Sequence, residues 1–314
     1  MTDPRKLAAR SSSDAPKVRR LEDQFDEASP VGADLAQGRA ILRKLQGRSL
    51  KKPSSTRVIT VANQKGGVGK TTSAVNIAAA LATGGLKVVV IDGDPQGNAS
   101  TALGAVHEQG TRSVYDVVVG GEPLASVLQD CPEIENLRIA PSNIDLSSAE
   151  IELIGIDRRE HRLRTAVDQF IDESGDDRPD YIIIDSPPSL GLLTLNALVA
   201  GREVLIPIQT EYYALEGLTQ LMKSIEMVRE RLNPDVRIST ILLTMFDKRT
   251  NLAQEVASEV RSYFPNETLS MEIPRNVRIS EAPSFQQSVM TYDPRSSGAI
   301  AYLAAAHEIA DRAN

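Results

Sequence analysis

A glycine-rich run, NQKGGVGKTT, occupies residues 63–72 and constrains the fold more than any other segment. It follows a β-branched stretch at 57–62 and precedes a helical pattern over about 71–82, which Gly84 and Gly85 end. A strand, a glycine loop and a helix in this order are typical of a phosphate-binding loop. The sequence therefore predicts an α/β fold in which a strand ends at a phosphate site.

The start of the run differs from the ordinary phosphate loop, G-x-x-x-x-G-K-[ST]. Gly69, Lys70 and Thr71 match the end of that pattern, but Gln64 stands at its first glycine position and Lys65 follows. A lysine this early in the loop is badly placed to fold back on the phosphates of its own site. We expect Lys65 to reach across a symmetric dimer to the partner's nucleotide instead.

The rest of the loop has expected roles in holding a nucleotide with Mg²⁺. Glycines let backbone N–H groups approach phosphate oxygens, and the start of the helix adds a favourable partial charge. Lys70 should lie along the β- and γ-phosphates, the Thr71 hydroxyl should bind Mg²⁺, and Thr72 should hold the α-phosphate. The expected nucleotide-binding residues here are Gln64, Lys65, Gly66, Gly67, Val68, Gly69, Lys70, Thr71 and Thr72.

Strand patterns alternate with helical patterns along the rest of the chain. Strands are expected at 57–62, 87–91, 137–140, 180–184, 203–208, 237–245 and 269–273, and helices near 71–82, 145–156, 159–174, 191–200, 214–232, 251–263 and 298–312. Runs such as KVVVI at 87–91 are continuously apolar, which is typical of parallel strands buried on both faces. The pattern predicts a doubly wound, mainly parallel sheet with helices on both faces and ligands beyond the carboxyl ends of its strands.

Aspartates follow two of these strands at the edge where ligands are expected. Asp185 ends the strand at 180–184 in the Walker B manner and should hold Mg²⁺, usually through water. Asp94, after the strand at 87–91, should orient an attacking water or complete the magnesium shell. A polar turn with helix-capping aspartates is the alternative interpretation of residues 92–98.

Composition sets residues 1–55 apart from the rest of the chain. They hold 12 Lys and Arg against 7 Asp and Glu, although the whole chain has a net charge of −7. Their serines, prolines and few large apolar residues predict a mostly disordered basic leader before a single domain at 56–314. A short helix at 33–45, and a role as a partner-docking or DNA-touching arm, are the alternatives.

Other features narrow the classes of protein to consider. No apolar run reaches eighteen residues and no signal core is present, so we expect a cytoplasmic protein without a membrane partner. The single cysteine, Cys131, excludes an internal disulfide and a multi-cysteine metal site, and the three histidines lack metal-ligand spacing.

Taken in order, the motifs resemble those of a known family. The runs NQKGGVGKTT, VIDGDPQGNAS and IIIDSPPSLG resemble the ParA/Soj chromosome- and plasmid-partitioning ATPases, which belong to a wider deviant-Walker family with MinD. TEYYALEGL, LLTMFDKRTN, IPRNVRISEAPSFQQSV and YDPRSSGAIAYLAAAHEI fit as well, so the resemblance covers about residues 57–312.

This resemblance implies a Mg²⁺-dependent ATPase that acts as a switch in DNA partition. ATP would join two subunits into a homodimer, with Lys65, Lys70 and Asp94 as the catalytic residues. The dimer would bind double-stranded DNA non-specifically on the nucleoid, and a ParB-type partner would stimulate hydrolysis and release. Two alternatives stay open: a MinD-like membrane-cycling ATPase, and a metabolic or electron-transfer ATPase of the nitrogenase iron protein type.

The resemblance also implies roles for residues near the C-terminus. Pro274 and Asn276 would line the adenine pocket. Arg249 and Arg278 would touch DNA, and Arg275 belongs to the same basic cluster, since arginine suits phosphate contacts. The helix at 298–312 lacks the basic face of a membrane-surface helix, which favours core packing and disfavours the MinD-like alternative.

Overall fold

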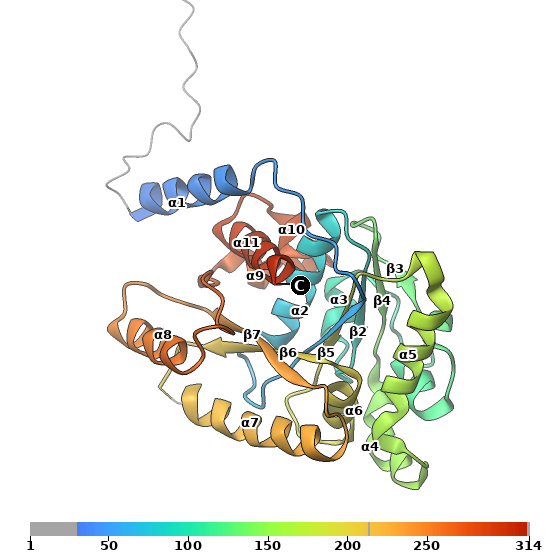
Figure 1. Cartoon of the computed structure of the whole chain (residues 1–314). Helices are drawn as coiled ribbons and strands as arrows, with labels where there is room; N and C mark the ends of the chain where they lie inside the picture. Colours follow the sequence, from blue (N-terminus) through green and yellow to red (C-terminus); the bar gives the residue numbers. More distant parts are fainter. Residues whose placement is uncertain (1–29, 213, 313–314) are drawn as a thin grey trace, which may run out of the picture.

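A seven-stranded sheet forms the centre of the computed structural model, which describes residues 30–212 and 214–312 (Figure 1). Its strand order is β3-β4-β2-β5-β1-β6-β7, and all neighbours are parallel except the antiparallel edge strand β3. The strands are β1 Arg57–Val61, β2 Val88–Asp92, β3 Gln129–Asp130, β4 Leu137–Ala140, β5 Tyr181–Asp185, β6 Glu203–Gln209 and β7 Arg237–Thr244. The predicted doubly wound, mainly parallel fold is confirmed.

Helices cover both faces of this sheet. They are α1 Pro30–Leu45, α2 Lys70–Thr83, α3 Asn98–Ala102, α4 Ala149–Glu152, α5 Arg162–Ser174, α6 Leu192–Ala200, α7 Ala214–Arg231, α8 Asn251–Tyr263, α9 Val277–Glu281, α10 Val289–Tyr292 and α11 Ser297–Asp311. None of the helices in this described part of the chain combines the length and apolar character that a bilayer crossing requires.

Alternating side chains of the strands divide the core into layers. On β2, Val88 and Val90 pack toward α2 and α11, whereas Val89 and Ile91 pack toward α5 and α6. A third cluster joins β6 and β7 to α7 and α8. Because each central strand is buried on both faces, its sequence is a continuous apolar run, which is why it was recognisable.

Helix α11 packs into the core, as the sequence favoured. Ten of its residues are buried, and it contacts both α2 and α1. The Tyr302 hydroxyl lies 3.3 Å from the Ser73 hydroxyl on α2. The face of α11 toward the sheet is therefore occupied by protein.

Two local expectations are corrected by the structure. Residues 269–273 are not a strand. The Leu269 amide donates to the Ile241 carbonyl of β7 and the Ile273 amide to that of Leu243, so a step of four residues here matches a step of two on β7 and the residues between them leave the ladder. The Ser270 amide donates to the Glu308 side chain. The helix expected over 145–156 is broken into α4 and short 3₁₀ turns on either side of it.

The N-terminal segment is only partly described. The expectation of disorder for residues 1–29 lies outside the described residues. Residues 30–45 form helix α1, which includes the stretch 33–45 for which the sequence allowed a short helix. Helix α1 lies against α11 (Figure 1).

Candidate nucleotide-binding site

The glycine loop between β1 and α2 forms an open cradle. Gly67 and Gly69 have φ angles of 75° and 87°, a left-handed conformation that glycine adopts without a Cβ clash. A Cβ built on Gly66 or Gly67 would meet nothing within 4 Å, so the space in front of the loop is unfilled. Gly69 precedes α2 and makes no side-chain cap, which leaves the first backbone N–H groups of α2 available to an anion.

The base of the loop is fixed by one asparagine. Asn63 accepts a hydrogen bond from the Lys65 amide at 3.0 Å, and its Nδ2 donates to the Pro207 carbonyl at 2.8 Å. These contacts tie the loop to β6. The cradle is therefore held in place by the neighbouring strand without a ligand.

The two lysines of the loop lie in different surroundings. Lys70 is 7% exposed, and its Nζ donates to the Lys65 carbonyl at 3.3 Å. Burial lowers the pKa of Lys70, while Asp185 and Asp94 act to raise it. The Lys65 side chain is directed elsewhere, because its Nζ forms an ion pair with Glu211 at 2.8 Å.

Two buried carboxylates stand opposite each other on neighbouring parallel strands. Asp92 ends β2 and Asp185 ends β5, and the two residues are partners in the strand register. Both are completely buried. Asp92 accepts hydrogen bonds from the Ser100 amide and hydroxyl at 2.8 and 2.7 Å, whereas neither carboxylate oxygen of Asp185 has a hydrogen-bond partner.

This burial changes how readily the pair ionises. Desolvation raises the pKa of Asp92 to about 6, against the hydrogen bonds from Ser100. Desolvation, and then the charge of Asp92, raise the pKa of Asp185, whereas neighbouring Thr71 and Lys70 act to lower it. The neighbouring groups therefore compensate for only part of the charge on an ionised Asp185 carboxylate.

These residues fit a magnesium–nucleotide site. Mg²⁺ is commonly bound through one or two carboxylates together with phosphate oxygens and waters. The unpaired Asp185 oxygens and the nearby Thr71 hydroxyl supply such ligands beside the open cradle. Among the described residues, no cluster of three or more His, Cys, Asp or Glu is placed to hold a metal ion by itself.

The loop after β2 places Asp94 beside the same site. Asp94 is 8% exposed, its Oδ1 accepts from the Gln96 amide at 3.0 Å, and its charge acts on Lys70. Gly93 donates to the Asp185 carbonyl at 2.9 Å, and a Cβ there would lie 2.7 Å from that oxygen. A glycine is thus required where the two loops meet, and Asp94 comes together with Lys70 and Asp185.

The expected adenine residues lie in a segment beside β7. Pro274 forms a parallel bridge with Phe246, and Asn276 caps α9 by accepting from the Arg278 amide at 2.8 Å. A cavity of about 270 Å³ opens beside the start of α2, lined among others by Thr72, Asn98, Ile279 and Gln287. Neither Pro274 nor Asn276 lines it, so their adenine role stays a prediction.

The arginines expected to touch DNA come from two segments that the Phe246–Pro274 bridge holds together. Arg249 is paired with Asp247 at 2.7 Å, and this contact, with a contribution from Arg275, lowers the pKa of Asp247 to about 2. Arg278 is paired with Glu281 at 2.9 Å. Arg249 and Arg278 therefore each have a local acid that a phosphate group would have to displace.

Two residues of the site were not singled out by the sequence. Asp92 holds the loop after β2 by accepting hydrogen bonds from Ser100 and from the Asp94 amide. In the sequence, its position at the end of a strand was the one feature that pointed to it. Glu211 holds Lys65, although 146 residues separate them in the chain. No local sequence pattern predicts an ion pair between residues so far apart, and Glu211 was named only within the family-like run TEYYALEGL.

Comparisons with known proteins agree with this geometry. The AAA_31 family, described as an AAA domain, matches residues 56–238. The chain is 48% identical over 256 residues to the chromosome partitioning protein ParA of Myxococcus xanthus, covering 82% of this chain and 88% of that protein. It is also 48% identical over 254 residues to the sporulation initiation inhibitor protein Soj of Bacillus subtilis, covering 81% and 98%.

Solved structures share the fold. A Mycobacterium smegmatis protein described as cobyrinic acid a,c-diamide synthase, with bound ADP and magnesium, is 37% identical with a TM-score of 0.67 over 82% of this chain and 93% of that one. The septum site-determining protein MinD from Pyrococcus horikoshii, complexed with Mg-ADP, is 27% identical with a TM-score of 0.63 over 81% and 96%. The sequence motifs, the P-loop geometry and the long, high-identity matches agree, and the chain belongs to the ParA/Soj family of chromosome-partitioning ATPases.

Proposed function

We propose that this protein is an ATP-dependent switch for DNA partition. Two copies close around two Mg·ATP molecules, and the dimer binds double-stranded DNA without sequence preference on the nucleoid. A ParB-type partner stimulates hydrolysis, which separates the subunits and releases DNA. Membership of the ParA/Soj family supports the partition role, and the geometry of the P-loop supports the nucleotide dependence.

The observation that carries this proposal is the unpaired Asp185 carboxylate behind the open cradle. A buried charge without a partner is costly, and in proteins such a group is usually compensated by a counter-charge or a metal. Here the cation that acts on Asp185 is Lys70, and the Lys70 Nζ donates a hydrogen bond to the Lys65 carbonyl. The site is therefore complete only when a magnesium–phosphate group joins it.

Each residue of the site has a role that follows from its position. Backbone N–H groups of the loop and Lys70 would hold the phosphates, and Thr71 and Asp185 would hold Mg²⁺, whose charge would stabilise the negative charge on the phosphates. Asp94, at the adjoining loop, orients the attacking water. Phosphoryl transfer relies mainly on such positioning and charge stabilisation.

Lys65 provides the link between the subunits. In the single chain the Lys65 ammonium forms an ion pair with Glu211 at the surface. The Lys65 side chain is 35% exposed and the Glu211 side chain is 50% exposed. An exposed ion pair of this kind contributes only about 0–1 kcal/mol. Triphosphate oxygens of a partner subunit compete readily with Glu211, so we propose that Lys65 exchanges one anion for the other when the dimer forms.

DNA binding is assigned to Arg249, Arg275 and Arg278. In one subunit Arg249 and Arg278 are paired with acids, so each gives up an ion pair to contact phosphate. Joining two subunits doubles the number of contacts, which raises avidity and steepens the dependence on salt. This is why the nucleotide state controls DNA binding.

The two alternative functions find less support. In an electron-transfer ATPase an iron–sulfur cluster requires cysteine thiolates. Cys131 is 7% exposed, and burial raises its pKa to about 12, which disfavours the thiolate. A MinD-like cycle requires a membrane-binding amphipathic helix, whereas α11 is packed against α2 and α1.

The decisive experiment is DNA binding by the purified protein at moderate salt with ADP, ATP or a non-hydrolysable ATP analogue. We expect retention with ATP and the analogue and little with ADP; equal retention with all three would contradict the switch.

Arg278→Glu should lose DNA but still dimerise with ATP. Asp94→Ala should bind DNA persistently with ATP because hydrolysis stalls, and normal turnover by Asp94→Ala would refute its role. Liposome sedimentation with ATP tests the membrane alternative.

A further inference from the structure

A strongly basic stretch lies outside the nucleotide site and the expected DNA arginines. Residues 36–52 contain Arg39, Arg43, Lys44, Arg48, Lys51 and Lys52 and no acidic residue. The rest of the chain from residue 56 onward is acidic, with 23 basic and 35 acidic residues. We call residues 36–52 the basic strap. Its charge is opposite to the net charge of the rest of the chain from residue 56.

The strap is docked on the body of the protein at defined points. Gly38 packs against Ile300 of α11, since a Cβ there would lie 3.1 Å from the Ile300 Cδ1. Further along, Leu50 is 8% exposed and fits over Gly84, where any added Cβ would overlap it. These contacts hold the backbone of residues 38–50 against the body of the protein, so the cations between them project from a docked segment.

The cations of the strap divide into two groups. At its C-terminal part, Arg48 and Lys51 pair with Asp311, and Lys52 pairs with Asp180. On α1, Arg43 and Lys44 are exposed and have no ion pair with any of the described residues. The C-terminal cations thus fasten the strap, and Arg43 and Lys44 leave their charges to solvent.

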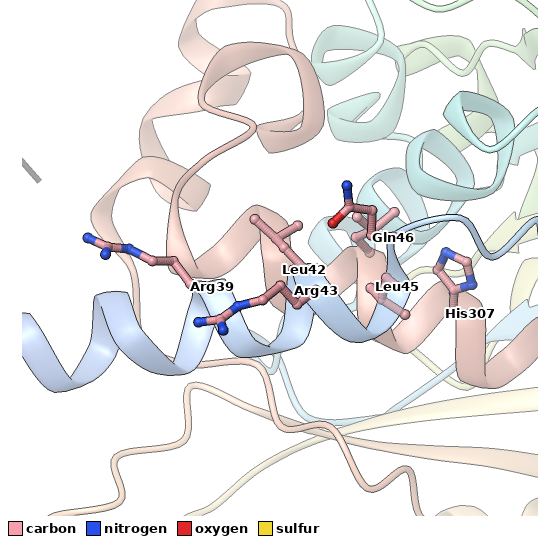
Figure 2. Close-up of a pocket in the computed structure, with 7 residues that line it drawn as sticks. Arg39, Leu42, Arg43, Leu45, Gln46 and His307 are labelled. Carbon is pink, nitrogen blue, oxygen red and sulfur yellow. The ribbon is translucent and has the colours of Figure 1, made fainter. Parts of the chain in front are cut away.

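Helix α1 presents these charges beside a shallow hollow of about 460 Å³ against α11. Figure 2 shows Arg39 and Arg43 on neighbouring turns of α1, with their guanidinium ends away from His307. Arg43 and Lys44 are consecutive on α1, so their long side chains offer two cations to one stretch of a phosphodiester chain.

The strap and the segment expected to touch DNA both contact the N-terminal part of α11. Helix α9, which carries Arg278, packs on the first turn of α11 through Ile279 and Gly298, and α1 packs there through Gly38 and Ile300. Figure 1 shows α1 and α9 both against α11. Because Gly298 and Ile300 are two residues apart, the two helices lie on nearly opposite sides of α11, and a duplex that contacts both has to pass over its N-terminal end.

We propose that the basic strap is a second DNA-backbone contact, with Arg43 and Lys44 as its phosphate-binding residues. The proposal rests on the DNA-binding function proposed above and extends it. An acidic protein segment is the competing occupant of this face. DNA is favoured because the exposed charges of residues 36–52 are cations without interspersed acids.

The test is a salt titration of random-sequence duplex DNA binding by the full chain with the ATP analogue. The variant Arg43→Ala/Lys44→Ala removes two cations from each subunit. Each lost phosphate contact reduces the slope of log K against log salt by about 0.9. We expect the slope to fall by about 2 to 4, according to whether one or both subunits of the dimer contact the duplex, and affinity at moderate salt to fall about tenfold or more.

Controls separate a local contact from a general effect of charge. Lys223→Ala/Arg231→Ala removes the same charge from exposed positions on α7 and should leave the slope unchanged. Arg43→Lys/Lys44→Arg keeps the charge and should bind like wild type. Basal ATP turnover and the thermal unfolding midpoint should be the same in all variants, since neither residue touches the nucleotide site or the core.

The outcomes distinguish the two proposals. If wild type fails to bind DNA with the analogue, the proposed function fails and this inference fails with it. If wild type binds and Arg43→Ala/Lys44→Ala binds with the same slope and affinity, only the inference is overturned. Unchanged DNA binding with a loss of binding to a ParB-type protein would assign the strap to a protein partner and also overturn it.

Discussion

Replacing Asp185 with asparagine should stabilise the nucleotide-free protein while it removes stabilisation by the nucleotide. Asp185 is completely buried, both of its oxygens lack a hydrogen-bond partner, and it faces Asp92 across the sheet. Its charge is therefore unfavourable until a cation arrives. Asparagine has nearly the same shape, carries no charge and supplies amide donors beside the Asp92 carboxylate.

The size of the effect follows from the cost of an unpaired buried polar group, which is about 1–3 kcal/mol. For a domain of this size, each kcal/mol raises the midpoint of thermal unfolding by about 2–4 °C. We therefore expect Asp185→Asn without nucleotide to unfold roughly 2–12 °C above wild type. Wild type should gain about 2.7 kcal/mol with Mg·ATP at 100 times its Kd, and the variant should gain much less.

The stability of the nucleotide-free protein should also depend on pH. Burial raises the folded-state pKa of Asp185, and it raises that of Asp92 from 3.8 to about 6. A raised pKa gives stability that is fully present below the ordinary value and is lost as pH rises through the folded value. The stability of wild type without nucleotide should thus fall from about pH 4 through about pH 6, and Asp185→Asn should fall less.

Thermal unfolding between pH 4 and pH 8, with and without Mg·ATP, measures both effects. Asp180→Asn is a matched control at the other end of β5, because Asp180 accepts from the Lys87 amide at 2.9 Å and pairs with Lys52 at 3.3 Å. That variant should be less stable than wild type. A nucleotide-free Asp185→Asn that is also less stable, with an unchanged pH profile, would refute the reasoning.

Three further predictions concern the lysines of the loop and the far end of the sheet. Lys70→Ala should abolish productive nucleotide binding in equilibrium titration, and retained micromolar affinity with turnover would contradict the assigned cradle. Glu211→Gln should release Lys65 in both subunits and tighten ATP-dependent dimerisation by up to about thirtyfold, since each of the two exposed pairs contributes at most about 1 kcal/mol; weaker dimerisation in analytical ultracentrifugation would show that Glu211 assists the dimer. Arg57→Met should destabilise the protein by about 3 kcal/mol in denaturant unfolding, because the buried Glu203 carboxylate that Arg57 binds at 2.6 and 2.8 Å would keep only the more distant Arg237 at 3.5 Å. Arg57→Met/Glu203→Met should recover most of this loss, and a double variant as unstable as the single one would argue against the ion pair as the cause.

Local patterns were sufficient for most of the elements. The buried strands were recognisable because each is a continuous apolar run, and the glycine loop because its residues are contiguous and its chemistry is short-range. The roles expected of Lys70 and Thr71 likewise come from their place after Gly69, and they stay predictions. The strand prediction for residues 269–273 was wrong although their apolar pattern is strand-like, because the hydrogen bonds of Leu269 and Ile273 to β7 are out of ladder register.

The sequence by itself determined the phosphate loop, the alternation of strands and helices, and the family, since each resides in contiguous residues. Only the tertiary structure decided that Asp92 faces Asp185, that Glu211 holds Lys65, and that α1 docks on α11. These contacts join residues far apart in the chain, and they depend on the order in which the strands pair. Strand order minimises the free energy of the whole fold, so no local pattern carries it.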